Sequence, residues 1–185
     1  FAHDRLSHAE LTAACLDGHL VGLGEAYAPA DAVETAWLRA RSLAPVLGAY
    51  LAATHLTAAW VHGALAEAPG RHTVARAVSR RLHHVPDRRL IYRDARIVAR
   101  DLDCIAGVHT TTPARTLADL ARDVARRRGD PGAQSAASAL AAVPGAPRAA
   151  IVCLASQGAV PGKPGGMALL RAWEAEPPAA VPRTR

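Results

Sequence analysis

The chain has 185 residues, of which 50% are hydrophobic, 21% are charged and only 4% are aromatic. This composition is typical of a globular protein with a core of Ala, Leu and Val. It excludes an intrinsically disordered chain. The sequence contains no run of about 18 apolar residues, so no membrane span is predicted. The formal net charge is +6, and residues 71–100 carry more than the whole excess, because nine arginines are balanced there by only two aspartates.

A helix followed by a hairpin is predicted near the N-terminus. Residues 7–17 begin with a Ser-x-x-Glu capping box, and the apolar runs at 19–23 and 25–29 flank Gly24, as in a tight β-hairpin. A helix and a hairpin in this order form the second half of a winged helix-turn-helix, in which the hairpin is the wing. We therefore expect residues 1–33 to form a reduced winged-helix-like element.

An α/β domain with a small sheet is predicted for residues 34–128. Helices are expected at 34–48 and 53–65, the first of them interrupted by Pro45. Alternating or apolar runs predict strands at 72–78, 89–94 and 104–110. We expect the first two of these strands to pair antiparallel. A Thr-Thr-Pro sequence then predicts the start of the clearest helix in the chain, which ends in basic residues and a glycine at 126–129.

The composition shifts to Ala, Pro and Gly in residues 129–185, which predict a helical C-terminal extension with a frayed tail. Its helices are expected at 133–143, 148–157 and 167–176, around a turn rich in Pro and Gly at 158–166. We therefore expect an α+β protein in which the winged-helix-like element, the α/β domain and the helical part follow one another.

The sequence offers little sign of catalytic or metal chemistry. Nine histidines are present, but no group of them has the spacing of a zinc site with three or four ligands. No phosphate-binding loop, nucleophile elbow, zincin motif or dinucleotide-binding glycine fingerprint occurs. Three widely spaced cysteines, an odd number, predict free thiols in a reducing cytoplasm. We therefore expect no catalytic residue, no metal and no cofactor.

Two segments resemble motifs of a known family. Residues 55–65, HLTAAWVHGAL, are similar to the Ser/Thr-Ala-Ala…His-Gly-Leu helix of AbiEi-type antitoxins. Residues 108–122, VHTTTPARTLADLAR, are similar to the Val-Thr-Thr-Pro-x-Arg-Thr-Leu-x-Asp-Leu-Ala segment of the same family. The motif residues are His55, Thr57, Ala58, Ala59, Trp60, His62, Gly63, Thr111, Thr112, Pro113, Arg115, Thr116 and Asp119. The order of the predicted strands between the two segments also matches that family.

This resemblance implies an antitoxin and DNA-binding transcriptional regulator of a type IV toxin–antitoxin system, which is not an enzyme. Family members pair an N-terminal winged-helix DNA-binding domain with a C-terminal α/β domain that is associated with antitoxicity. Their cognate toxin is a nucleotidyltransferase-like protein. The alternative is a protein-interaction module that has the same fold and has lost DNA binding.

The residues that would contact DNA are expected in the arginine-rich segment. A complete winged helix has about three helices before its wing, whereas only 18 residues precede His19. The predicted helix at 7–17 also contains no Arg or Lys, the residues that most often read base edges. If the chain binds DNA, we therefore expect one arginine-rich face or rim to contact mainly phosphates. Its members are Arg71, Arg76, Arg80, Arg81, Arg88, Arg89 and Arg93, although Arg88 and Arg89 are neighbours in the sequence and at least one of them should lie off this face. The alternative is a solvated arginine-rich surface without a partner.

The motif residues also have a purely structural interpretation. Thr112 can cap a helix that begins at the following proline, and Arg115 can pair with Asp119 four residues later. Trp60 is expected in the core, and Gly63 is expected to permit close packing inside a helix. Motifs of this kind often mark the core of a fold, so they do not by themselves define a binding surface.

Overall fold

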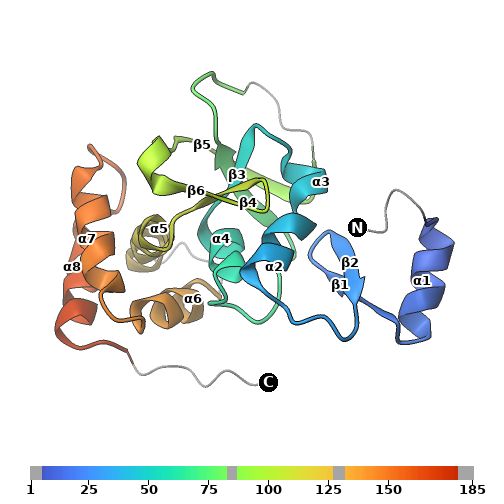
Figure 1. Cartoon of the computed structure of the whole chain (residues 1–185). Coiled ribbons are helices and arrows are strands. Elements are labelled where there is room, and N and C mark those ends of the chain that lie inside the picture. Colours follow the sequence, from blue (N-terminus) through green and yellow to red (C-terminus); the bar gives the residue numbers. More distant parts are fainter. Residues whose placement is uncertain (1–5, 83–86, 127–131, 179–185) are drawn as a thin grey trace.

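The computed structural model of the chain describes residues 6–82, 87–126 and 132–178. A five-stranded mixed sheet lies at the centre of the described part, with helices stacked on one side of it and a separate two-stranded hairpin and helix at the opposite end (Figure 1). The expected α+β class is therefore confirmed. The expected end of the helix at 127–129 and the last residues of the expected frayed tail, 179–185, lie outside the described residues.

The N-terminal helix and hairpin are present as expected. Helix α1 (His8–Leu16) begins at a complete capping box, in which Ser7 and Glu10 each accept a hydrogen bond from the other's backbone N–H. Strands β1 (Leu20–Leu23) and β2 (Ala26–Pro29) pair antiparallel. Helix α1 packs on β1, so the three elements form one small unit.

The central sheet has the strand order β5-β4-β3-β7-β6. Its strands are β3 (Leu51–Ala53), β4 (His72–Arg76), β5 (Leu90–Arg96), β6 (Leu102–Ile105) and β7 (Val108–Thr111). Strands β4 and β5 pair parallel, so the expected antiparallel pairing is wrong. A parallel pair needs a crossover of about a dozen residues or more, and residues 77–89 are long enough to provide it.

The expected single strand at 104–110 is also wrong, because this segment contains a tight turn. Strands β6 and β7 pair antiparallel on either side of Ala106 and Gly107. Both turn residues have positive φ angles, of 52° and 79°, which a two-residue hairpin of the favoured twist requires. Strand β3 was not expected, because it has only three residues and all of them are buried, so no polar alternation marks it.

The helices expected at 34–48 and 53–65 have different bounds in the structure. The expected helix at 34–48 is two helices, α2 (Ala36–Ser42) and α3 (Ala44–Leu47), with Pro45 in the first turn of α3. Helix α4 (His55–Val61) ends before Gly63, which has a φ of 81° and no neighbour within 4 Å of an added Cβ. Gly63 therefore serves the left-handed turn after the helix rather than close packing inside it.

The C-terminal part is helical, as expected. It follows α5 (Pro113–Ala125) and comprises α6 (Gly132–Ala141), α7 (Ala146–Ser156) and α8 (Lys163–Ala175). Helix α8 begins four residues earlier than expected, because Gly162 caps it at a φ of 79° and Pro164 fits its first turn. A Cβ on Gly166 would lie 2.8 Å from Cγ of Arg122, so α8 packs closely on α5.

Two hydrophobic cores meet at α4. Ala59 belongs to the core between α4 and the helices α5–α8, which includes Leu117 and Leu170. Trp60 belongs to the core between α4, the sheet and the helices α2 and α3, which includes Val74. Helix α4 is therefore the element through which the sheet and the helical part are held together.

Among the described residues, no single helix is long and apolar enough to cross a membrane. Helices α6 and α7 pass that test only as a pair, by length and composition, and they are bent by 111° at the break between them.

Candidate functional site

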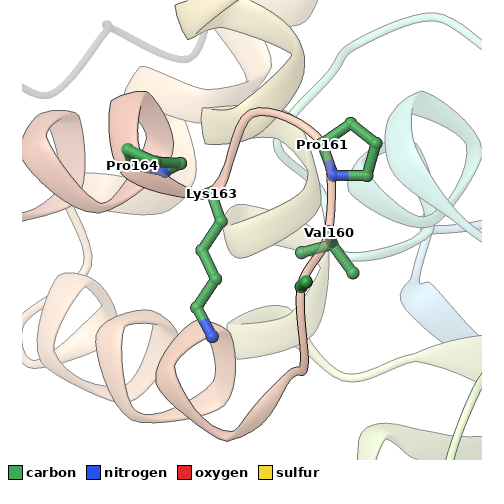
Figure 2. A pocket seen from close by; sticks show the side chains of 5 residues that line it. Val160, Pro161, Lys163 and Pro164 are labelled. Carbon is green, nitrogen blue, oxygen red and sulfur yellow. The ribbon is translucent and has the colours of Figure 1, made fainter.

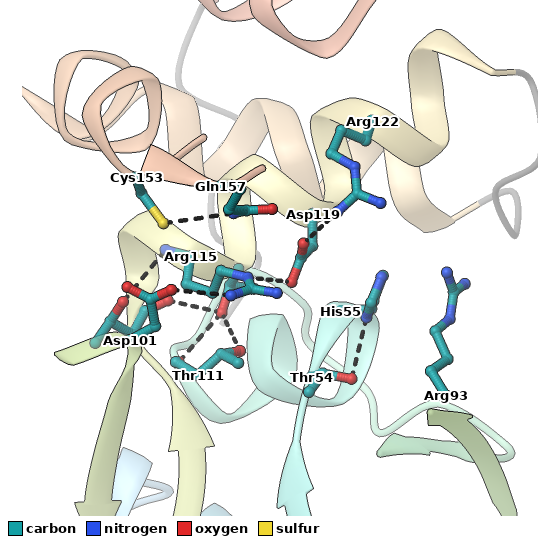
Figure 3. Close-up of polar contacts among 12 residues, drawn as sticks. Thr54, His55, Arg93, Asp101, Thr111, Arg115, Asp119, Arg122, Cys153 and Gln157 are labelled. Carbon is teal, nitrogen blue, oxygen red and sulfur yellow. Dashed lines mark hydrogen bonds and ion pairs between the residues drawn. The ribbon is translucent and has the colours of Figure 1, made fainter. Parts of the chain in front are cut away.

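The second family motif contains a buried ion network on α5 (Figure 3). Arg115 donates from Nε to Oδ2 of Asp119 (2.8 Å) and from Nη1 to Oδ2 of Asp101 (2.9 Å), at the end of the short helix η2 (Ala99–Asp101). The side chains of Arg115 and Asp101 are 8% exposed and that of Asp119 is 2% exposed. Burial opposes the charged form of Arg115, but the two aspartates outweigh it and raise the pKa of its guanidinium. The expected pairing of Arg115 with Asp119 is confirmed.

A second group of charges joins α4, α5 and β5. Arg93 holds the carboxylate of Asp123 with both terminal nitrogens, at 2.8 and 3.4 Å. Nε2 of His55 lies 3.7 Å from the same carboxylate, and its Nδ1 lies 3.0 Å from Oγ1 of Thr54. His55 has a φ of 50°, a conformation that a non-glycine residue keeps only when its surroundings fix it. Burial lowers the pKa of His55 despite the nearby aspartates, so its ring is neutral at pH 7.

The threonines of the motif connect β7 with α5. Thr112 caps α5 by accepting a hydrogen bond from the backbone N–H of Arg115 (3.2 Å), with Pro113 at the first helical position. The hydroxyls of Thr111 and Thr116 are 2.8 Å apart and buried. These contacts fix the angle between β7 and α5. The threonines of the motif therefore have a structural role.

The first family motif is equally buried, and it contacts the second. Oγ1 of Thr57 accepts a hydrogen bond from a backbone N–H of β4 (2.8 Å), and Ala58 and Ala59 are fully buried against the neighbouring elements. At the end of α4, Nε2 of His62 lies 2.7 Å from the carbonyl oxygen of Thr111. The structure therefore brings the two motifs together at the junction of α4, β7 and α5.

The sequence did not predict that three residues belong to this junction: Asp101, Arg122 and Asp123. Arg122 donates from Nη1 to Oδ1 of Asp119 (2.9 Å). Residues three apart on a helix are neighbours, so the spacing of Asp119 and Arg122 could have predicted this ion pair. Asp101 and Asp123 meet their arginines across long stretches of chain, so no local pattern marks them. Among the described residues, no group of three or more His, Cys, Asp or Glu side chains could hold a metal ion.

The cysteines lie apart from one another. Cys15, Cys104 and Cys153 carry free thiols. Cys153 is beside the ion network in Figure 3, where the side chain of Gln157 donates to its sulfur at 3.8 Å. Burial raises the pKa of this thiol to about 11, which makes it a poor nucleophile at neutral pH.

Five of the seven arginines expected to bind DNA have structural partners. Arg71 donates to the backbone carbonyls of Arg88 and Leu90 at 3.0 and 2.8 Å, and so ties β4 to the start of β5. Arg76 and Arg81 form ion pairs with Asp94, at 3.4 and 2.8 Å. The other two paired members are Arg89, with Asp87 and Glu25, and Arg93, with Asp123.

The remaining two arginines, Arg80 and Arg88, are exposed. The guanidinium of Arg80 lies over the ring of Tyr50, 5.0 Å from its centre. A stacked guanidinium keeps its N–H groups available at the edge of the ring. Among the described residues, Arg80 and Arg88 are therefore the two members of this set whose guanidinium groups form neither a hydrogen bond nor an ion pair.

The tip of the β1–β2 hairpin is docked on the α/β part. The carboxylate of Glu25 lies 3.1 Å from Nε2 of His72 and accepts a hydrogen bond from Nη1 of Arg89 at 2.8 Å. Gly24 has a φ of 54°, and an added Cβ would lie 2.5 Å from Oγ of Ser42. The turn of the expected wing is therefore a packing surface, and sequence reasoning missed Glu25 and His72 because they are far apart in the chain.

A hollow of about 410 Å³ lies beside the turn before α8. Val160, Pro161, Lys163 and Pro164 line it, and Figure 2 shows the side chain of Lys163 extended away from the three others. Its Nζ donates to the carbonyl oxygens of Ala155 and Gln157, at the end of α7. Lys163 therefore caps α7, and the Val-Pro-Gly-Lys turn has a structural role.

A family model described as the AbiEi antitoxin C-terminal domain matches residues 51–157, which is more than half of the chain. The matched range begins at β3 and ends just after α7, so it includes both motifs and the ion network. No curated protein and no solved structure matches the chain.

Proposed function

Since the chain belongs to the AbiEi antitoxin family and is thus an antitoxin of a toxin–antitoxin system, we propose that it also binds DNA as a transcriptional regulator. In this proposal residues 1–33 are the reduced winged-helix-like element, residues 34–128 are the antitoxin core, and residues 129–185 are a helical extension. The cognate toxin is a nucleotidyltransferase-like protein, and both act in the cytoplasm.

The charge of residues 71–100 is the observation that carries this proposal. Nine arginines and two aspartates give this segment a net charge of +7, and Arg80 and Arg88 are exposed there. Guanidinium groups of this kind bind phosphate oxygens and release counterions, which supplies affinity without reading sequence.

The N-terminal helix and hairpin are not the main DNA contact in this proposal. Helix α1 contains no Arg or Lys to offer to base edges, and the tip of the hairpin is occupied by its contacts with the α/β part. We therefore assign the main DNA contacts to the arginines around β4 and β5, with the N-terminal unit as their support.

A titration with the chain's own promoter DNA at several salt concentrations tests the proposal. Neutralising n phosphates gives a log–log salt slope near −0.9n. Replacing both Arg80 and Arg88 by Ala should reduce the magnitude of that slope by roughly 1–2 and weaken binding about equally on promoter and unrelated DNA. The matched control is Arg148→Ala, which removes an exposed arginine from α7.

The outcomes separate the two functions that the sequence left open. An unchanged slope in the double variant would exclude these arginines from the DNA contact. A loss confined to promoter DNA would mean that they read bases instead of phosphates. Absence of DNA binding by the unmodified chain at low salt would favour the protein-interaction module.

A further inference from the structure

The N-terminal unit, which consists of α1 and the β1–β2 hairpin, is joined to the rest of the chain by a short connection and by the tip of its hairpin. Residues 30–34 connect β2 to the cap of α2 without helix or strand, and most of them are exposed. At the tip, Leu23 packs against the core that contains Trp60, and Gly24 approaches Ser42 closely. Helix α1 lies on the side of the hairpin that faces away from the sheet (Figure 1).

The base of the hairpin is packed less closely than its tip. A groove of about 840 Å³ lies between Leu20 and Pro29 at the base of the hairpin and Trp37 of α2. The side chain of Trp37 is 54% exposed, whereas an added Cβ on Gly24 would lie only 3.0 Å from Cη2 of Trp60. The tip therefore provides the closer packing, and its release is the step that would free the unit.

The unit is acidic, and its tip docks on the basic segment. Residues 6–38 contain five acidic residues and no Lys or Arg, whereas residues 71–100 have a net charge of +7. The carboxylate of Glu25 accepts a hydrogen bond from Nη1 of Arg89 at 2.8 Å and lies 3.1 Å from Nε2 of His72. A polyanion that approaches Arg89 would meet this carboxylate at the same guanidinium. The contact that supports Arg89 therefore also occupies it.

Arg89 would stay in place if Glu25 left it. Asp87 accepts hydrogen bonds from its Nε at 3.0 Å and its Nη2 at 2.7 Å, so the guanidinium would remain oriented while Nη1 lost its acceptor. The side chain of Arg89 is 52% exposed, and a phosphate oxygen is a strong acceptor for such an N–H group. Release of Glu25 would therefore give the arginine-rich segment one more contact for a phosphate.

We propose that the N-terminal unit is an autoinhibitory element of the arginine-rich segment, and that DNA must displace its hairpin tip. In the docked form Glu25 occupies Arg89. In the released form Nη1 of Arg89 binds a phosphate, and the unit stays tethered through residues 30–34. This inference rests on the proposed function, because it assigns the regulation of the proposed DNA contact.

A disulfide that locks the tip tests the proposal. An added Cβ on Gly24 would lie 3.5 Å from Cβ of Ser42, within the range of about 3.5–4.5 Å that disulfides require. The double variant Gly24→Cys and Ser42→Cys, with Cys15, Cys104 and Cys153 replaced by Ala, can be compared with itself in its oxidised and reduced forms. The oxidised form should bind promoter DNA at low salt about threefold or more weakly, with a log–log salt slope smaller in magnitude by about 0.9, because one phosphate contact is lost.

Glu25→Gln tests the same contact without a crosslink. Glutamine keeps the size of the side chain and an oxygen that can accept from His72, but it has no charge to hold Arg89. The affinity for DNA should therefore rise by about two- to tenfold. The matched control is Asp31→Asn, which removes an exposed carboxylate of the same acidic stretch beyond the base of the hairpin and should change the affinity by less than about twofold. Circular dichroism checks the folding of each variant.

The outcomes separate this inference from the proposed function. Equal affinity and salt slope in the oxidised and reduced forms, with DNA bound by both, would overturn the inference and leave the DNA contact in place. Equal gains in Glu25→Gln and Asp31→Asn would also overturn it, by showing a general effect of net charge. Absence of DNA binding by every form at low salt, Glu25→Gln included, would refute the DNA contact and the inference together.

Discussion

Removal of the Arg115 guanidinium should destabilise the chain strongly. Arg115→Met keeps most of the side-chain volume and the helix propensity of α5, but it deletes two hydrogen bonds of 2.8 and 2.9 Å to carboxylates. Hydrogen bonds to charged groups contribute about 1.5–3 kcal/mol each, and removing one partner of a buried pair costs about 3–5 kcal/mol. Because Asp119 keeps its contact with Arg122, we expect a loss near the lower end, about 3 kcal/mol.

Chemical denaturation provides the measurement. Urea unfolding followed by tryptophan fluorescence reports on Trp60 and Trp173, which are buried in the two cores. The matched control is Arg81→Met, because the Arg81–Asp94 pair has the same 2.8 Å separation while its side chains are 71% and 36% exposed. Exposed pairs contribute about 0–1 kcal/mol, so this variant should stay close to the unmodified chain.

The comparison of the two variants decides between burial and proximity as the source of the effect. If Arg115→Met and Arg81→Met lower the free energy of unfolding equally, the network has no special role and the reasoning is refuted. Asp101→Asn provides a milder second variant in case Arg115→Met does not fold. It keeps the shape of the side chain and removes the charge from one arm of the network, so it should fall between the two methionine variants.

Two further effects are expected. Gly24→Ala should lower the free energy of unfolding by about 1–3 kcal/mol, because the residue has a φ of 54° and its Cβ would lie 2.5 Å from Oγ of Ser42. The control in the same urea assay is Gly22→Ala, where the added Cβ meets nothing within 4 Å. Equal losses in the two variants would contradict the docked turn. The melting temperature should fall as pH drops from 7 toward 5.5. Burial lowers the pKa of His55, His62 and His72 in the folded state, so below about pH 6.5 the unfolded chain binds more protons than the folded one. Replacing all three histidines by Gln should flatten this profile, and an equally steep profile in that variant would assign the pH effect to other groups.

Local patterns predicted the elements whose contacts are local. The capping box of Ser7 and the cap of α5 at Thr112 depend on residues three positions apart, and the Arg115–Asp119 pair lies within one helical turn. The apolar stripe of α5 has the helical period. These features can be read without knowledge of the fold, because all the atoms concerned belong to one turn of chain.

The features that were missed depend on pairing across the chain. Strand β3 has three residues and lies between β4 and β7, so its extended form is imposed by its neighbours and not by its own side chains. The parallel pairing of β4 with β5 depends on the crossover that connects them and not on a local pattern in either strand. The Glu25–His72 contact joins positions 47 residues apart, which no spacing rule reaches.

Burial of the family motifs separates the part of the chain that defines its fold from the part that contacts other molecules. Arg115 and Asp119 are charged residues that sequence reasoning would ordinarily place on a surface, yet both are buried and satisfied by each other and by Asp101. A satisfied buried group has no capacity left for a ligand. If the chain binds DNA as proposed, the contacts must therefore be made by exposed residues outside the motifs, such as Arg80 near the sheet.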